Sequence, residues 1–393
     1  MKKTFLILFS FIGMSLGLPK ESVPCFALNQ ERSIDGSPSV SITFPDGYTD
    51  TMLLNRYYND EENDAFASKE NCHFIGHLEG EPDACIAMTG CPGSEDLEFT
   101  IMSEHSHDTI FKWYKDGQVQ VIESPFKDGK GKSEMLEVVK SRNAENETWT
   151  LEDGDEEVDN AIEAQEAQIA ENCNGGTNCE SVPSTNELTI RVGYGEGFLS
   201  KTGSHDNAKA YIQASMPHIQ ALYCHSSSLG TKIKVKIDGS IKFYSGKNLQ
   251  ASGPKLQEMW DTTKNDIGSA DLMMYMGYDT DLWGTIGIAY KGTVCQHAGY
   301  NKYKQSINEW RPTHAEAGHT IAHEIGHNLG MSHDFSESHA ASGCDKTGVM
   351  SYGPPVNQWS TCSRADFQAH YIATKSSWCM PSKHSLLSLM SPQ

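Results

Sequence analysis

The order of hydrophobic and polar positions divides the chain into two differently built parts. Around residues 39–44 and 98–114, β-rich stretches lie among turn residues, which predicts a small β-rich domain. From residue 188 onward, short apolar runs alternate with longer segments of helical spacing, so this part is predicted to be α/β. Its predicted elements are a strand at 188–194, a helix at 207–223 broken or kinked near Pro217, one long or two short strands over 232–244, a helix at 256–265, strands at 271–276 and 285–290, a helix at 314–329, and a last helix running from Ser363, as N-cap, towards Trp378.

An acidic block separates these two parts. Residues 143–190 contain no Lys or Arg, and Asp and Glu crowd the first third of this stretch. Such a block repels itself and lacks apolar anchors, which predicts an exposed linker. Asn146 lies in the one Asn-x-Ser/Thr triplet of the sequence and is the expected glycosylation site.

The first residues are typical of a secretory signal peptide. The basic Lys2 and Lys3 precede an apolar run at 5–16, which is too short to span a bilayer as a permanent anchor. Small residues at Ser15 and Gly17 fit cleavage after Gly17. No second apolar stretch reaches membrane-spanning length, so we expect a secreted, extracellular monomer without a membrane anchor.

Charge and cysteine content narrow the partners and the compartment. The formal net charge of −21 argues against nucleic acid as a partner, because phosphate binding needs a concentrated basic surface. Eleven cysteines behind a signal peptide imply disulfide bonds, since the export route is oxidising. Their odd number leaves at least one thiol unpaired, or paired outside the chain.

The segment 323–334 carries the candidate chemistry. On a helix, residues four apart lie one turn above each other, so His323 and His327 can direct imidazole nitrogens at one ion. Gly330 can leave the helix with a positive φ, which brings His333 round as a third ligand. Three histidines with one position left open for water are typical of a catalytic zinc site.

Glu324 is the candidate general base. It is rotated by about 100° around the helix from His323, so its carboxylate flanks the metal without occupying it. From there it can take a proton from a zinc-bound water and pass it to the leaving amine of a peptide. His319 lies on the same face, but three histidines at four-residue spacing span about 12 Å. That is too far for one ion, so His319 is expected to be a structural or surface residue.

The extended motif resembles the signature of the metzincin zinc peptidases, because Gly330 and His333 follow the shorter His-Glu-x-x-His pattern. Met350, in Gly348-Val349-Met350-Ser351-Tyr352, stands where the methionine turn of metzincins is expected. By this resemblance, Met350 forms an apolar floor under the zinc histidines.

Within the metzincins, the sequence is similar to the adamalysin or reprolysin group, the snake-venom and ADAM-like enzymes. Asp334 directly after the third histidine, the run at 284–290 and the closing Cys379 carry this likeness, and Asp334 is expected to be structural. Residues 72–80 and 89–91 are similar to the propeptide of the same family. The resemblance implies an α/β (α+β, metzincin-like) catalytic domain with a mixed, mostly parallel sheet and a zinc-binding active-site helix, preceded by a β-rich propeptide.

The resemblance also implies a domain order and a disulfide pattern. Bridges Cys295–Cys379 and Cys344–Cys362 are expected by analogy with adamalysins. The implied order is a signal peptide at 1–17, a propeptide at 18–142, an acidic linker or processing region at 143–180, a zinc metallopeptidase catalytic domain at 181–380 and a C-terminal tail at 381–393.

Two further sites are suggested by family likeness, each beside a plainer interpretation. Gly287, Ile288 and Ala289 would form the sheet edge along which an extended substrate adds itself as a strand, although an ordinary buried strand fits this sequence equally. Tyr352, two places after Met350, is typical of the astacin group. It either helps bind the tetrahedral intermediate or is a solvent-facing loop residue.

The sequence leaves open whether the chain binds calcium and how its precursor is kept inactive. Glu187 matches a calcium-binding glutamate of adamalysins, whereas Ser382 stands where an Asn ligand is expected. A propeptide cysteine switch could use Cys173 or Cys179, but these two can equally form a disulfide with each other. A trypsin-like cut at 140–142 would leave both cysteines on the mature chain.

We therefore expect a secreted zinc-dependent endopeptidase, made as a precursor, that hydrolyses peptide bonds of extracellular proteins. The alternative is a secreted zinc-containing binding protein of the same fold with little turnover. The intact Glu324 argues against that alternative, because loss of the general base is the simplest way to retire such an enzyme. The signal peptide and the cysteine usage argue against an intracellular metal-binding protein.

Overall fold

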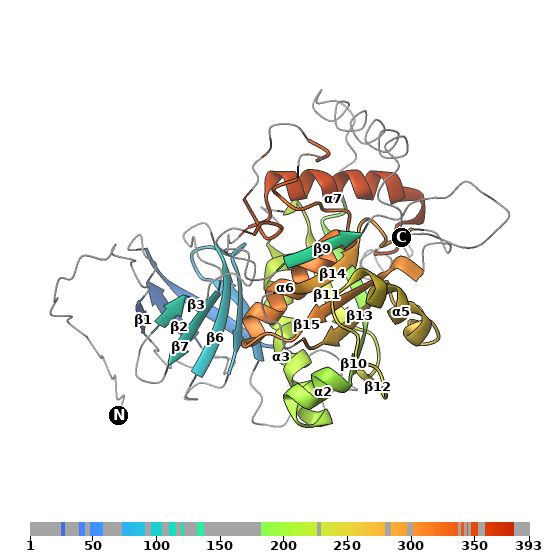
Figure 1. The fold of residues 1–393 in the computed structure, drawn as a ribbon. Helices are drawn as coiled ribbons and strands as arrows, with labels where there is room; N and C mark the ends of the chain where they lie inside the picture. The colour runs from blue at the N-terminus through green and yellow to red at the C-terminus, as the bar shows by residue number, and fades with distance from the viewer. Residues whose placement is uncertain are drawn as a thin grey trace, which may run out of the picture.

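The structure is a computed structural model that describes residues 25–27, 39–43, 48–57, 73–90, 96–103, 110–114, 119–121, 132–136, 182–225, 229–279, 284–296, 302–336, 339–341, 344, 347–352 and 358–380. Within these residues, one sheet belongs to the N-terminal part and a second sheet to the C-terminal part, with helices between and around them (Figure 1). The predicted signal peptide, the predicted glycosylation site Asn146 and the predicted tail after Met380 lie outside the described residues.

The first sheet, called the N-terminal sheet below, is antiparallel throughout, and each of its strands pairs with the next one in sequence. A β-rich part was predicted here, and it is present. The sequence had indicated only the regions of β2, β6 and β7. The strands are β1 (Cys25–Ala27), β2 (Ser39–Thr43), β3 (Thr49–Arg56), β4 (His73–Leu78), β5 (Cys85–Thr89), β6 (Asp96–Met102), β7 (Ile110–Tyr114) and β8 (Val119–Val121).

The second sheet has the strand order β11-β10-β13-β15-β14-β9, with β12 beside β10. Its pairings are parallel except for β14 with β15, which is antiparallel. The predicted mixed, mostly parallel sheet is therefore confirmed. The strands are β9 (Lys132–Leu136), β10 (Thr185–Gly195), β11 (Lys232–Ile237), β12 (Lys242–Tyr244), β13 (Leu272–Gly277), β14 (Thr285–Tyr290) and β15 (Gln305–Glu309).

Most of the predicted helices form, with some changed limits. The prediction of a break near Pro217 is wrong, because one helix runs through this proline. The last helix begins after Ser360 rather than at Ser363, and the 232–244 region is two short strands. The helices are α2 (Glu196–Thr202), α3 (His205–Cys224), α5 (Gly253–Thr263), α6 (His314–Asn328) and α7 (Thr361–Thr374), followed by the 3-10 turn η4 (Lys375–Ser377).

Helices α3 and α6 pack against each other between the two sheets, as Figure 1 shows. Helix α3 contacts β5 on one side and β11 on the other, and α6 contacts β14 and β15. The core on the C-terminal side continues into the N-terminal sheet, because Cys85, Ala87 and Met102 belong to the same buried cluster as the residues of α3. A separate cluster fills the other face of the N-terminal sheet.

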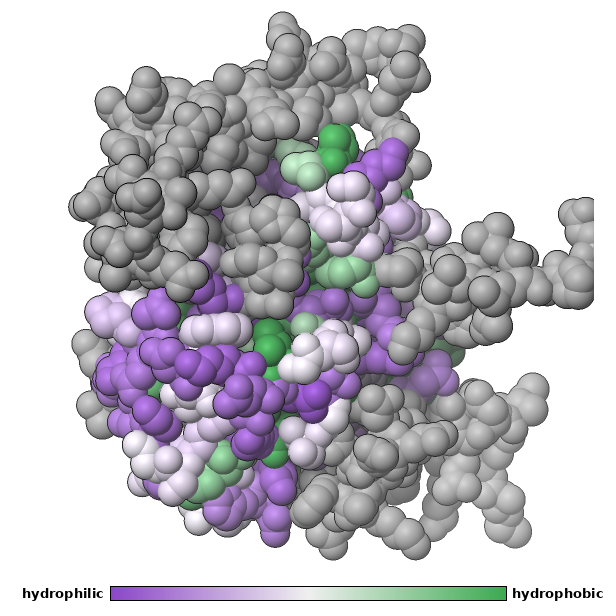
Figure 2. Space-filling view, turned by 90° about the vertical axis from the view of Figure 1, so that its right-hand side faces the viewer, coloured by the Kyte–Doolittle hydropathy of each residue, from purple (hydrophilic) through white to green (hydrophobic). Residues whose placement is uncertain are grey.

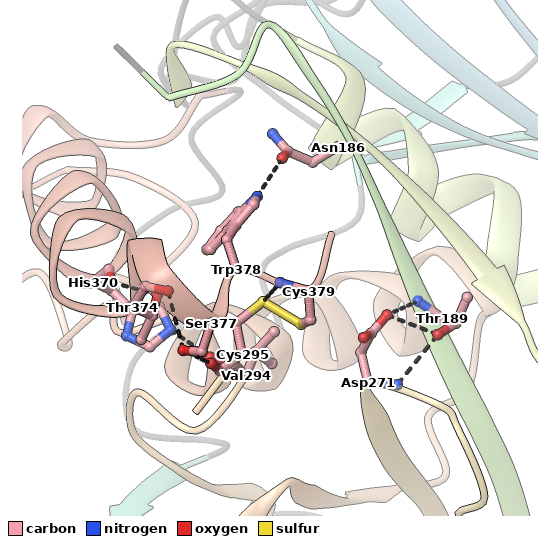
Figure 3. The surroundings of a disulfide bond; sticks show 10 residues. All are labelled: Asn186, Thr189, Asp271, Val294, Cys295, His370, Thr374, Ser377, Trp378 and Cys379. Atoms are coloured by element: carbon pink, nitrogen blue, oxygen red, sulfur yellow. Dashed lines mark hydrogen bonds between the residues drawn. A yellow bond between two sulfur atoms is a disulfide. The ribbon is translucent and has the colours of Figure 1, made fainter. Parts of the chain in front are cut away.

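Disulfide bonds brace the C-terminal part. Cys295 pairs with Cys379, and Cys344 pairs with Cys362, which are the two pairings expected from the family likeness. The first joins the segment after β14 to the segment after η4 (Figure 3). Next to it, the Trp378 indole Nε1 donates to Asn186 Oδ1 at 3.0 Å, which fastens the C-terminal segment to β10.

One face of the molecule is mainly polar where it is described. The face seen in Figure 2 is largely hydrophilic among the described residues, with only small hydrophobic patches. Among these residues, no helix combines the length and the apolar character needed to cross a membrane.

Candidate active site

Helix α6 positions the candidate metal ligands. The side chain of its N-cap Thr313 accepts from Glu316 N, and the Glu316 side chain accepts in return from the N-cap backbone, forming a capping box. At the other end, Asn328 Nδ2 donates to Tyr290 O at 2.8 Å, which ties the helix to β14. The chain then turns at Gly330, whose φ of +95° favours glycine. Both ends of the helix are therefore held before any ligand binds.

The structure brings the three predicted histidines together. His323, His327 and His333 are buried, and one nitrogen from each lies within 4.8 Å of the others. His327 Nε2 and His333 Nε2 are 3.1 Å apart. The fourth histidine of this helix face, His319, is buried but is not part of the group, so of the two roles predicted for it the structural one applies.

Hydrogen bonds fix the orientation of the helical pair. His323 Nδ1 lies 2.9 Å from Val349 O, and His327 Nδ1 lies 2.8 Å from Met331 O. Each Nδ1 therefore carries the proton and leaves Nε2 as a lone-pair donor. Burial, reinforced by the neighbouring imidazoles, lowers the pKa of both residues well below the usual value, and burial lowers the pKa of His333 to about 4. Three neutral imidazoles facing one point suit a zinc ion.

The side chain of Glu324 extends from α6 towards strand β14. It is buried. A Cβ built on Gly287 of β14 would come 2.2 Å from Glu324 Oε1, so the glycine at this place makes room for the carboxylate. The predicted edge strand and the predicted base are thus neighbours.

Two residues that follow the third histidine in sequence, Met350 and Asp334, pack and hydrogen-bond around the site. Met350 is buried, and a Cβ on Gly326 would come within 2.6 Å of its Sδ, so Met350 packs directly against the ligand helix. Asp334 Oδ1 accepts hydrogen bonds from Ser360 Oγ and, at 2.9 Å, from Ser363 Oγ at the start of α7. Burial raises the pKa of Asp334 to about 6. Asp334 thus links the segment of the third histidine to the start of α7.

Two aromatic side chains flank His333 on its solvent side. The Tyr352 hydroxyl lies 3.4 Å from His333 Nε2. Phe335 stacks on the His333 ring with centroids 4.8 Å apart and remains 55% exposed. Phe335 was not predicted as a site residue, although its place directly after Asp334 in the motif was an available signal.

A segment from the N-terminal half reaches the same site. Strand β9 pairs in parallel with β14, with Ser133 opposite Gly287 and Glu134 opposite Ile288. Figure 1 shows β9 apart from the N-terminal sheet and beside β14. Gly287, Ile288 and Ala289 therefore belong to a strand, β14, whose outer edge is paired with β9 of the same chain. No local pattern in the sequence indicated this pairing.

Other predicted site residues lie elsewhere. The Glu187 carboxylate is 3.3 Å from Lys236 Nζ, with which it forms an ion pair. Ser382, Cys173, Cys179 and the 140–142 segment lie outside the described residues, as does Asn146.

A family model of the reprolysin type, for Metallo-peptidase family M12, matches residues 184–385, which is more than half of the chain. The chain belongs to the M12 metallopeptidases. The predicted family is therefore confirmed, and membership implies a zinc ion, for which the three converging histidines are the candidate ligands.

Individual relatives of this M12 peptidase differ in how much of the chain they match. Human (Homo sapiens) disintegrin and metalloproteinase domain-containing protein 9 is 34% identical over 116 residues, which is 28% of this chain and 13% of that protein. This chain thus spans a small fraction of that relative's length. Metalloproteinase-II from Bacteroides fragilis (12% identity, 82% and 87% of the two chains) and a chaperone-substrate complex (16% identity, 48% and 36%) have TM-scores of 0.36 and 0.33, too low to add to the family assignment.

Proposed function

We propose that this M12 peptidase is a secreted zinc-dependent endopeptidase that is made as a precursor and cleaves extracellular proteins, with Glu324 as its general base. The observation that carries the proposal is the convergence of His323, His327 and His333 beside a buried glutamate that faces an edge strand. Disulfide bonds in the C-terminal part are in keeping with an oxidising, extracellular setting.

Each of these residues would have its own role in peptide hydrolysis. His323, His327 and His333 would hold zinc, which when bound supplies a Lewis acid that polarises a peptide carbonyl and acidifies water. Glu324 would accept the proton of the attacking water at a carboxylate oxygen and hand it to the leaving amide nitrogen. The Tyr352 hydroxyl, beside His333, would donate to the oxygen on which negative charge develops.

Strand β14 would align the substrate. An extended peptide can add to the edge of a sheet through main-chain hydrogen bonds, and Gly287 places this edge against Glu324. The exposed ring of Phe335, stacked on His333, offers an apolar contact to a substrate side chain next to the scissile bond.

The uncut chain is proposed to be an inactive precursor because of strand β9. Strand β9 covers the edge of β14 that a substrate would need, so the uncut chain cannot bind an extended peptide there. The acidic stretch that follows β9 in sequence is the proposed processing region.

Replacing Glu324 with Gln tests the proposed chemistry. Peptide hydrolysis by the processed enzyme should fall by about 10²–10⁴-fold, while metal analysis still finds one zinc bound per chain, because Glu324 is not a ligand. His333→Ala is the contrasting variant and should lose the zinc. Full turnover in the Glu324→Gln protein would refute the role of the base, and a zinc-loaded wild-type enzyme without turnover would favour the binding-protein alternative.

A further inference from the structure

The N-terminal sheet is fastened to the C-terminal part by a covalent bond. Cys85 of β5 pairs with Cys224 at the end of α3, across 139 residues of sequence. The acidic stretch at 143–180 lies between these two cysteines in the chain. A cut anywhere in that stretch therefore breaks the backbone between the two parts but leaves this bond intact.

The face of the sheet around Cys85 is built for permanent contact. Residues alternate between the two faces of a strand. Ile86 and Met88 of β5 pack into the sheet's own core, whereas Cys85 and Ala87 join the core around α3. On β6, Met102 lies opposite Cys85 and joins the same core. One face of the sheet therefore shares a single apolar core with the C-terminal part.

Polar groups on this face are matched across the contact. The imidazole of His218, on α3, is fully buried between two threonines of the sheet, with Nε2 2.9 Å from Thr89 Oγ1 and Nδ1 2.7 Å from Thr100 Oγ1. Thr89 Oγ1 donates its own proton to Ala214 O at 3.0 Å, so His218 Nε2 must donate to it and Nδ1 must accept from Thr100. Burial lowers the pKa of His218 to about 3, and the neutral ring fits this arrangement.

The sheet also completes the cap of the active-site helix. Glu98 Oε2, on β6, accepts from His314 N at 2.7 Å and Ala315 N at 3.2 Å, the first two amides of α6. The first amides of a helix have no partner inside the helix, and a carboxylate there is favoured by the helix dipole. If the sheet left, these amides and His218 would lose their partners and apolar residues would face water.

We propose that the N-terminal sheet remains on the processed enzyme, so that the mature protein consists of two chains joined by Cys85–Cys224. The inference rests on the proposed function only in taking 143–180 as the processing region. Because β9 precedes this region, a cut there leaves β9 on the retained chain, close to β14 and at a high effective concentration. Full release of β14 then requires a second cut between β8 and β9, where Lys127 and Lys130 offer basic sites.

The test uses the full secreted chain with a site-specific protease sequence inserted after Arg142. It is made in the Glu324→Gln background, so that self-cleavage and the outcome for the proposed function do not enter. After the cut, denaturing electrophoresis without reductant should show one species of full mass, and reductant should release two chains. Two separate chains without reductant would overturn the proposal.

Two variants identify the bond. After the cut, Cys85→Ser/Cys224→Ser should give two chains without reductant, whereas the matched control Cys344→Ser/Cys362→Ser, whose bond lies within the C-terminal chain, should remain at full mass. Peptide mapping of the wild type should find Cys85 linked to Cys224. A different partner for Cys224, or chains that stay joined in the Cys85→Ser/Cys224→Ser protein, would also overturn the proposal.

Discussion

Gly287 leaves the space that the Glu324 carboxylate occupies. A Cβ on Gly287 would meet Glu324 Oε1 at 2.2 Å and Cδ at 2.6 Å, distances at which the side chain must move. We predict that Gly287→Ala lowers peptide hydrolysis by about 100-fold, because small displacements of a catalytic group have effects of this size. Zinc content should be unchanged. Activity assays with metal analysis check this.

A second background controls for general damage to β14. In Glu324→Ala the colliding atoms are absent, so adding Gly287→Ala should cost little stability there. In the parent protein it should cost more, giving a coupling free energy of about 1 kcal/mol or above from denaturant unfolding. Equal costs in both backgrounds would show that the contact with Glu324 is not the cause.

Glu309 of β15 makes the fold sensitive to pH. Burial, with the charge of Asp279 added and opposed by the hydrogen bond from Ala251 N, raises its pKa to about 8. The folded chain therefore holds a proton that the unfolded chain has already released. Unfolding free energy should fall as pH rises from the ordinary glutamate range to about 8, by up to about 1.4 kcal/mol per pH unit, and then level off.

Glu309→Gln should remove this slope, because the amide stays neutral and can still accept from Ala251 N. Denaturant unfolding of both proteins at about pH 5.5 and about pH 8.5 measures the difference. The variant should gain relative stability at the higher pH. The same pH dependence in the two proteins would contradict the assignment to Glu309.

At the scale of elements, the local sequence pattern predicted those strands and helices whose hydrophobic residues are periodic. It failed where contacts with residues distant in sequence determine the structure. The helical spacing of α6 and the apolar run of β14 were both readable, and so was the convergence of two histidines of α6 with His333. Helix α3 runs through Pro217 because its residues there are buried against both sheets, and this packing outweighs the lost hydrogen bond. Ser360 rather than Ser363 caps α7, because its hydroxyl accepts from Ser363 N and is itself held by Asp334, which is far away in sequence.

Two strands of the C-terminal sheet had no readable signal. Strand β15 is polar in four of its five residues, yet all five are buried, so no alternation marks it. Strand β9 is recognisable only through its partner β14. The candidate metal site was thus predictable because its residues are close in sequence, whereas its covering strand was not.

Strand β9 should hold down the activity of the uncut chain. Consecutive residues of a strand direct their N–H groups to opposite sides, so Glu134→Pro/Met135→Pro removes at least one donor that faces β14. We predict that the uncut variant hydrolyses a peptide at least about 10-fold faster than the uncut wild type, since a strand held mainly by main-chain hydrogen bonds then competes less well with substrate. A matched pair in the acidic stretch, Gln168→Pro/Ile169→Pro, should have no effect. Unchanged activity in the β9 variant would remove β9 from the account of latency.

At the scale of the whole molecule, one buried carboxylate of the N-terminal sheet, that of Glu98, accepts hydrogen bonds from the first amides of α6. Burial raises the pKa of Glu98, but the hydrogen bond and charge of His314, with the hydrogen bond from the Ala315 amide, outweigh it and leave the pKa lowered. A lowered pKa means that the folded chain favours the ionised form. Its contribution to stability is complete above the ordinary glutamate pKa and is lost as pH falls through the lowered value.

Glu98→Gln should therefore reduce the unfolding free energy at neutral pH by about 1–3 kcal/mol, the range for charge-assisted hydrogen bonds to a helix end. The deficit relative to wild type should shrink in acid, where the wild-type carboxylate also becomes neutral. Exposed Glu79, directly after β4 of the same sheet, provides the control Glu79→Gln, which should change little. Hydrogen exchange adds a local measurement, because the amides of His314 and Ala315 should lose protection in Glu98→Gln and keep it in the control. If those amides stay protected, the sheet does not cap the active-site helix through Glu98, and the two parts of the molecule are held together by their shared apolar core, the hydrogen bonds of His218 and the disulfide.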